Sequence, residues 1–416
     1  MKSLILLATL FVASLTTVVA IPHRQGLNRF SLEAIRKSSS KPSFVREWVA
    51  AHQKWGKPVS QETLAAFSLL DDDGRVDVKP LPNDNMFIAD IKVGTPPQTL
   101  KVAIDTGSAD FWVQSTDTIY KEVTEGPWAP LYRPNASKTA HRVRGAEWEV
   151  EYIDGTHADG IVYLDTVRLG SFELKNTPIQ SAQIIAARFE SETGVTGIMG
   201  LAKTLPSNVE PPTPSLLDKL RPLLDKAVFT VDLRRNATGR FDFGYVDESR
   251  AKDKISWVST RNDSHHWDVT FDMTAWTGAR RVWMSRSFEA TIDTGTTLIF
   301  LPADLAGAYW NDVPNMRINP DLGDAFTFPC EFADELPDLL FKVPKTEHVL
   351  KIPGRYLRYS TVDDDPEYCW GGMQSADGLG GVTIIGDMAI KAWYVAFDLE
   401  ANKVGFANKE LDDIDD

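Results

Sequence analysis

Two copies of one four-residue signature stand out among the residues able to do chemistry. Asp-Thr-Gly-Ser begins at Asp105 and Asp-Thr-Gly-Thr begins at Asp293, each after a short apolar run. An apolar-apolar-glycine element follows each copy at nearly the same distance, ending at Gly200 and at Gly386. The chain is therefore predicted to consist of two copies of one half, each supplying one carboxylate.

The chemistry depends on whether the two carboxylates meet. A single aspartate at a strand end is usually a turn residue or a cap. If the two halves pack about a pseudo-twofold axis, however, Asp105 and Asp293 become a facing pair. Like charges that close cannot both ionise, so the pair would share one proton. One carboxylate could then take a proton from water while the other donates one to a carbonyl oxygen.

The remaining residues of each signature have physical roles of their own. Glycine after threonine lets the backbone turn tightly beside its counterpart, and the threonine hydroxyls can brace the two loops. The fourth residue carries a hydroxyl within reach of the outer carboxylate oxygen, which favours the ionised form. These positions are Thr106, Gly107 and Ser108 in the first copy and Thr294, Gly295 and Thr296 in the second.

Several further motifs, in a fixed order, give the chain a resemblance to the pepsin-like aspartic endopeptidases, above all to the secreted fungal penicillopepsin and aspergillopepsin group. The motifs are S-A-D-F-W-V from Ser108, T-G-I-M-G-L from Thr196, F-D-F-G-Y from Phe241, I-G-D from Ile385 and V-G-F-A from Val404. The resemblance implies a mostly β, bilobal pepsin-like double β-barrel with pseudo-twofold symmetry and a few short helices. It also implies Asp105 and Asp293 as catalytic residues, no metal or cofactor, protein and peptide substrates, inhibition by pepstatin-like compounds, and a monomer.

A β-hairpin is predicted where residues 148–152 alternate as a strand and residues 160–163 form the returning strand. By resemblance this hairpin is the flap that closes over substrate and excludes water from the carboxylates. Tyr152 stands in the place of the flap tyrosine, and Trp112 in the place of its hydrogen-bonding tryptophan. The cleft between the flap and the two carboxylates is the expected substrate site.

The tip of this hairpin departs from the family pattern. Ile153 stands where the family usually has glycine, and a β-branched residue does not readily adopt positive φ. Asp154 stands where some fungal relatives carry an acid that favours a basic P1 side chain, and a turn-forming aspartate is the alternative. The resemblance also places Val195 and Ile198 beside the flap tyrosine in a pocket for hydrophobic side chains, although both could equally be core. Thr297, with the glycine and threonine before it, would contact the substrate backbone.

The N-terminus has the features of a secretory signal over residues 1–20. Lys2 precedes an apolar run, and Val-Val-Ala ends at Ala20. Neither this segment nor any other has the roughly 20 predominantly apolar residues that a transmembrane helix needs. We therefore expect a secreted, extracellular protein without membrane association, with the vacuole as the alternative destination.

A basic segment follows the signal, whereas the whole chain has a formal net charge of −14. A basic arm that binds nucleic acid or directs targeting is one interpretation. The resemblance instead implies an inhibitory propeptide over residues 21–75, with Lys54 paired to the two carboxylates and no nucleic-acid partner. Protonation of the carboxylates in acid would release the segment. The maturation cut is expected between Leu70 and Lys79.

The rest of the chain is too long for one hydrophobic core, which predicts two lobes over residues 76–260 and 261–416. Short helices are expected at 214–220 and 303–310. Cys330 and Cys369 are the two cysteines; pairing is the default in a secreted chain, and they correspond to the second-lobe disulfide of the family. The N-x-Ser/Thr sequons, which predict glycosylation, begin at Asn135, Asn236 and Asn262.

Other interpretations receive less support from the residues. The adjacent His265 and His266 do not have metal-ligand spacing, and the glycines from Gly378 to Gly381 lack the ending of a phosphate-binding loop. A catalytically inactive binding protein is disfavoured by two intact signatures. A glycosidase using the same carboxylates would need them about 5 Å or more apart, against about 3 Å for a pair that shares a proton.

Overall fold

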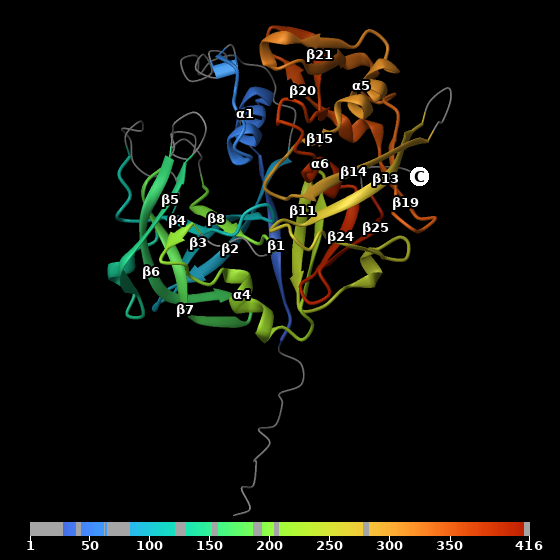
Figure 1. Ribbon diagram of the computed structural model, residues 1–416. Helices are drawn as coiled ribbons and strands as arrows, with labels where there is room; N and C mark the ends of the chain where they lie inside the picture. The colour runs from blue at the N-terminus through green and yellow to red at the C-terminus, as the bar shows by residue number, and fades with distance from the viewer. Residues whose placement is uncertain are drawn as a thin grey trace, which may run out of the picture.

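The computed structural model describes residues 28–38, 43–61, 63–64, 84–120, 130–151, 157–185, 194–203, 208–277 and 283–411. Three predictions fall outside these residues: the signal peptide, the maturation cut, and the flap tip with Tyr152, Ile153 and Asp154. In the described parts the molecule is mostly β with two lobes and a few short helices, which confirms the predicted fold class (Figure 1).

The largest sheet has fourteen strands and runs through both lobes. In spatial order its strands are β12 (Ser256–Ser259), β25 (Lys403–Asn408), β24 (Trp393–Asp398), β10 (Val228–Arg234), β11 (Ala237–Phe243), β1 (Phe30–Ser38), β2 (Asp84–Val93), β3 (Gln98–Asp105), β8 (Gly197–Gly200), β4 (Phe111–Gln114), β7 (Phe172–Ile184), β6 (His157–Leu169), β5 (His141–Glu151) and β9 (Val209–Glu210). A further pairing between β2 and β6 closes part of the first lobe into a barrel.

The second lobe contains two smaller sheets. The first is ordered β19 (Val349–Ile352), β18 (Leu339–Lys342), β13 (Asp268–Trp276), β14 (Met284–Ile292), β23 (Ile384–Ile385), β15 (Ile299–Leu301) and β22 (Met373–Ser375). The second is ordered β16 (Arg317–Asn319), β17 (Ala325–Pro329), β21 (Asp365–Gly371) and β20 (Arg358–Val362).

The α-helices with both ends in the described ranges are short. They are α1 (Phe44–Lys54), α4 (Leu216–Leu220), α5 (Ala303–Asn311) and α6 (Asp387–Ile390). Both helices predicted from the sequence are present. The first begins at Leu216 because the Ser215 hydroxyl accepts from the Asp218 amide while the Asp218 carboxylate accepts from the Ser215 amide, forming a capping box.

The internal repeat is visible in the strand pairing. In the first lobe β3 runs parallel to β8, β8 antiparallel to β4, and β4 parallel to β7. In the second lobe β14, β23, β15 and β22 repeat these three relations in the same order. Asp105 ends β3 and Asp293 directly follows β14, so the two aspartates occupy equivalent positions in the two lobes. This arrangement is the pseudo-twofold symmetry that the repeated signatures predict.

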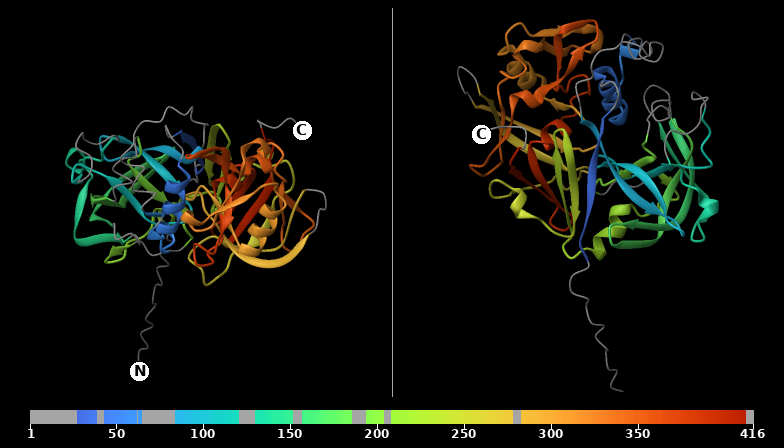
Figure 2. Two further views of the ribbon diagram at one scale, coloured as in Figure 1. Left: turned by 90° about the horizontal axis from the view of Figure 1, so that it is seen from above. Right: turned by 180° about the vertical axis from the view of Figure 1, so that it is seen from behind.

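Aromatic packing joins the basic N-terminal segment to the rest of the core. Phe30 in β1 stacks on Phe243 with ring centroids 4.5 Å apart, and Phe243 contacts Phe229 at 5.7 Å. Phe229 in turn stacks on Phe397 at 4.5 Å. These rings connect β1, β11, β10 and β24, and such pairs contribute beyond their buried area. The segment that contains β1 is therefore an integral part of the sheet (Figure 2).

A buried ion cluster ties the C-terminal end of the chain to β10. Lys409 donates to Asp232 at 3.0 Å, and Arg234 and Arg250 contact the same carboxylate. Burial would raise the pKa of Asp232, but the charges of Lys409 and Arg234 lower it to about 2. Burial lowers the pKa of Lys409 to about 8 against the attraction of Asp232. Removing one partner from such a cluster would leave an uncompensated buried charge.

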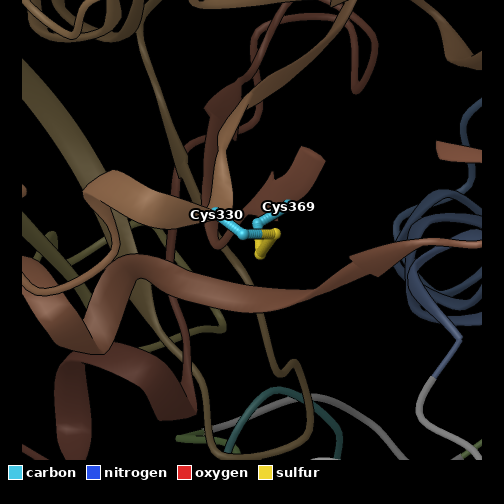
Figure 3. Close-up of a disulfide and its surroundings, with 2 residues drawn as sticks. All are labelled: Cys330 and Cys369. Atoms are coloured by element: carbon cyan, nitrogen blue, oxygen red, sulfur yellow. A yellow bond between two sulfur atoms is a disulfide. The ribbon is translucent and has the colours of Figure 1, made fainter. Parts of the chain in front are cut away.

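The two cysteines form the predicted disulfide (Figure 3). It joins the residue after β17 to β21, strands that are already paired through Phe328 and Cys369. The three sequon asparagines are exposed, and their glycosylation stays a prediction.

Replacing both Cys330 and Cys369 by alanine should lower the free energy of unfolding by at most about 4 kcal/mol, the chain-entropy value for a loop of this length. The β17–β21 pairing should preserve the fold, so the far-ultraviolet circular dichroism spectrum should stay unchanged. Urea unfolding of the double variant beside the oxidised parent measures the loss. Equal free energies of unfolding would show that this crosslink does not stabilise the lobe.

Candidate active site

The two signatures bring Asp105 and Asp293 to one buried place between the lobes. The exposed fraction of Asp105 is 4%, and that of Asp293 is 0%. Hydrogen bonds to the apolar-apolar-glycine elements fix the backbone of both residues. The Leu201 amide donates to the Asp105 carbonyl at 2.7 Å, and the Asp293 amide donates to the Ile385 carbonyl at 3.1 Å. The elements that the sequence pairs with each signature are thus its immediate structural supports.

Lys54, the last residue of α1, places its ammonium group between the carboxylates. Its Nζ donates to Asp105 Oδ1 at 2.7 Å and to Asp293 Oδ1 and Oδ2 at 2.8 and 2.9 Å. One cation therefore contacts both acids at once. The lysine reaches this position because α1 lies between the two lobes in each view (Figures 1 and 2).

The glycine of each signature leaves room for the opposite carboxylate. A Cβ atom at Gly107 would lie 2.4 Å from Asp293 Oδ1, and one at Gly295 would lie 2.2 Å from Asp105 Oδ1. Real Cβ atoms do not approach oxygen so closely, and glycine permits such an approach of the backbone. Each lobe's loop therefore packs directly against the other lobe's acid.

The two threonines brace the loops through a reciprocal set of hydrogen bonds. The Thr106 hydroxyl donates to the Ile292 carbonyl at 2.9 Å and accepts from the Thr294 amide at 3.0 Å. The Thr294 hydroxyl donates to the Ile104 carbonyl at 2.8 Å and accepts from the Thr106 amide at 3.1 Å. Both side chains are buried, so these bonds fix the relative position of the signatures where water cannot replace them.

Each carboxylate also accepts hydrogen bonds from its own signature. Ser108 donates to Asp105 Oδ2 and Thr296 donates to Asp293 Oδ2, both at 2.5 Å. The backbone amides of the two glycines donate to the inner oxygens at 2.8 and 2.9 Å. These donors favour ionised carboxylates and hold their orientation.

The electrostatics of the pair are asymmetric. Burial would raise the pKa of Asp105, but the Lys54 charge and the donors around this carboxylate lower it. Burial raises the pKa of Asp293, the Lys54 charge opposes the rise, and the charge of Asp105 adds to it. Burial would lower the pKa of Lys54, yet the two carboxylates raise it. One acid thus ionises readily while the other tends to keep a proton.

A third buried acid lies behind the pair. Asp387 is 1% exposed, its Oδ1 has no hydrogen-bond partner among the described residues, and its amide donates to the Thr296 carbonyl. Burial raises the pKa of Asp387 well above the ordinary value against the attraction of Lys391, and Asp293 contributes to the rise. In the sequence this residue is recognisable only as part of the Ile-Gly-Asp motif, since an isolated aspartate carries no signal of burial.

The helix that ends at Lys54 packs aromatic side chains against the second lobe. Phe44 stacks on Trp370 with centroids 4.3 Å apart and contacts Tyr359 at 6.0 Å. Trp48, one helical turn later, contacts Phe300 at 5.6 Å. These side chains occupy one face of α1, which is the face that the helix buries against the second lobe.

Other residues named from the sequence have different surroundings. Thr297, expected at the substrate backbone, donates to the Glu47 carboxylate of α1 at 2.7 Å. Trp112 packs on Trp148 at 6.2 Å, with Ile198 against the same cluster. The contact of Trp112 with the flap tyrosine stays a prediction, because that tyrosine is not described. Within the described ranges no group of three or more histidine, cysteine, aspartate or glutamate side chains could hold a metal ion.

Comparison with known proteins gives one consistent family. The sequence profile described as eukaryotic aspartyl protease matches residues 86–409. The chain is 34% identical to endothiapepsin from Cryphonectria parasitica, over 78% of this chain and 76% of the relative. It is 30% identical to podosporapepsin from Podospora anserina, over 89% and 84%. It is also 30% identical to penicillopepsin-1 from Penicillium rubens, over 95% and 96%.

Replacing Thr106 by valine should destabilise the protein, because the Ile292 carbonyl and the Thr294 amide then lose a buried partner. We expect a loss of about 2 to 4 kcal/mol in the free energy of unfolding. Serine at the same position keeps the hydroxyl and should lose less than half as much. Chemical denaturation of the two variants tests this bracing, and equal losses in both would indicate that packing, rather than hydrogen bonding, is responsible.

Proposed function

This chain belongs to the eukaryotic aspartyl protease family, and from that premise we propose that it is a secreted aspartic endopeptidase made as an inactive precursor. Membership of the family makes it a hydrolase of peptide bonds. The observation that carries the finer proposal is the pairing of one lysine with two buried carboxylates. Among the residues described, no helix is long and apolar enough to span a membrane.

In the proposed mechanism Asp105 and Asp293 share one proton and hold one water molecule. The ionised carboxylate takes a proton from the water, whose oxygen attacks the carbonyl carbon of the peptide bond, and the other carboxyl group protonates the carbonyl oxygen. Proton transfer to the amide nitrogen then accompanies C–N cleavage and restores the carbonyl group. Ser108 and Thr296 orient the two acids, and the reciprocal threonine bonds keep them at a fixed separation.

We propose that residues 21–75 are an inhibitory propeptide. Three contacts support this: the Lys54 ammonium donates to both carboxylates, Glu47 of α1 accepts from Thr297, and β1 pairs with β11 and β2. The segment is therefore held both at the active site and within the central sheet. The lobe boundaries near residue 260 and a cut between Leu70 and Lys79 remain part of the proposal.

The sign of the pH dependence follows from Asp105. Its pKa is lowered while Lys54 is bound. While Lys54 is protonated, the ion pair therefore stabilises the closed state at pH values above the pKa of the unpaired acid. This stabilisation is lost as the pH falls through the pKa of the paired acid. Acid should thus release the propeptide.

The proposed substrates are peptides with hydrophobic side chains. A basic P1 residue is a further candidate, because Asp154 stands where some fungal relatives carry an acid that favours one. We expect a monomer that pepstatin-like compounds inhibit.

Replacing Asp293 by asparagine should lower kcat for a protein substrate at least about a thousandfold, since the variant lacks one of the two proton-transferring groups. Digestion of haemoglobin at about pH 3, with and without pepstatin, measures the loss. Asp90→Asn makes the same change on an exposed residue and should leave kcat unchanged. Retained digestion by the Asp293 variant would exclude the two-carboxylate mechanism, and an inactive parent would favour a binding protein.

Replacing Lys54 by methionine in the full chain should let the precursor become active nearer neutral pH. The variant lacks the ion pair that holds the segment at the active site, while methionine fills similar volume. The midpoint of activation should rise by about one pH unit or more, because one unit corresponds to about 1.4 kcal/mol of differential interaction. Lys57→Met is the matched control. Activation at an unchanged pH in the Lys54 variant would contradict autoinhibition through this pair.

A further inference from the structure

A cavity of about 740 Å³ lies along the chain where it continues after Lys54. Its walls come from the residues around the start of β13, from β14, from the start of α5 and from the loop between Ala376 and Thr383. Trp55, the residue next to Lys54, forms the remaining wall. Any chain that replaces the propeptide at the carboxylates must therefore present a neighbouring side chain to this cavity.

Within the cavity, Trp55 contacts His266. Their ring centroids are 5.0 Å apart and the rings are tilted by 50°. Trp55 Nε1 and His266 Nδ1 are both buried, and neither has a hydrogen-bond partner within the described part of the chain. An aromatic ring thus covers the imidazole while one of its nitrogens stays unpaired, which leaves the imidazole able to gain a proton or to bond a ligand.

Three of the four acids that line the cavity, by contrast, have side-chain partners. Asp268 accepts from the hydroxyls of Ser264 and Thr291. Glu289 pairs with Arg261 at 2.7 Å, Asp304 pairs with Arg286 at 2.8 Å, and Asp377 is exposed at the rim. Burial raises the pKa of Glu289 against the attraction of Arg261, which keeps this acid neutral over a wider range of pH. Unlike Asp268, Glu289 and Asp304, the imidazole can therefore change its charge without first breaking an ion pair or a hydrogen bond through Nδ1.

We propose that His266 makes this cavity selective for an uncharged aromatic side chain of the substrate and, in acid, selective against a cationic one. The proposal rests on the proposed protease function and adds a specificity-determining residue to it. Trp55 is the first example of the preferred side chain. A neutral or charged imidazole packs favourably on an aromatic ring, whereas an imidazolium repels a lysine or arginine side chain in the same confined space.

The surroundings of His266 act on its pKa in both directions. Burial lowers the pKa of His266, and Lys54 contributes, while the negative charges of Asp268, Asp293 and Asp105 oppose this. When a substrate replaces the propeptide, the positive charge of Lys54 leaves and the acids remain. The pKa of His266 should then rise, so that in acid the imidazole is charged and the cavity disfavours cations.

The test uses enzyme obtained by acid activation of the full chain and a set of peptide substrates. In these peptides lysine replaces phenylalanine at each position flanking the cleaved bond in turn, and the position with the largest effect identifies the residue that enters the cavity. At that position we compare the ratio of kcat/KM for the phenylalanine peptide to kcat/KM for the lysine peptide. In the parent enzyme this ratio should fall about tenfold between pH 3 and pH 6, since a tenfold change corresponds to one unit of pKa. In His266→Phe the ratio should fall much less, because only the acids of the cavity still change charge.

Two controls keep the test decisive. His265→Phe changes the exposed neighbour and should behave as the parent. His266→Gln removes the titration without adding an aromatic ring, and it serves in place of the phenylalanine variant if that one folds poorly. The ratio should again fall much less than in the parent. Equal pH dependence in the parent and in both His266 variants would overturn the proposal. Failure of the protease function itself is distinguishable, because the parent would then cut none of the peptides.

Discussion

Two carboxylates buried at one place cannot both stay ionised without a cation, and this constraint governs the rest of the molecule. Asp105 and Asp293 carry opposite shifts in pKa although their immediate donors are almost identical. The symmetry of the fold gives the two carboxyl groups similar surroundings, and the electrostatic repulsion between them makes their pKa values differ. Such a site needs rigid supports, because a small increase in separation would let both acids ionise. The glycine contacts and the threonine bonds provide that rigidity across the lobe boundary.

The N-terminal segment satisfies the constraint by supplying the cation. It is held at two distant places: β1 lies between β11 and β2 in the central sheet, and α1 buries its aromatic face against the second lobe. Glu47 and Lys54 then reach polar groups of the cleft from this anchored helix. A single surface ion pair would be worth little, but an ion pair in a buried site with several donors is much stronger. The strength of this closure therefore depends on both anchors.

Much of the site follows from local sequence. An Asp-Thr-Gly element needs its glycine for close approach and its hydroxyls for hydrogen bonds, and the structure uses each residue in that way. The helices at 216–220 and 303–311 lie where their apolar spacing predicts them. Local sequence does not indicate a function for Asp387, Trp55 or His266. Nothing in their neighbouring residues distinguishes a buried acid, or an imidazole covered by a tryptophan, from an exposed one.

The sequence by itself determined that the chain has two similar halves, that each half contributes one acid, and that Cys330 and Cys369 pair. These properties are encoded in short motifs, in their order and in residue types. Only the tertiary structure decided that Glu47 meets Thr297, that Trp55 covers His266 and that β1 enters the sheet. Each of these contacts joins residues about 200 or more positions apart, and their formation depends on how two complete lobes pack, which no local pattern of residues specifies.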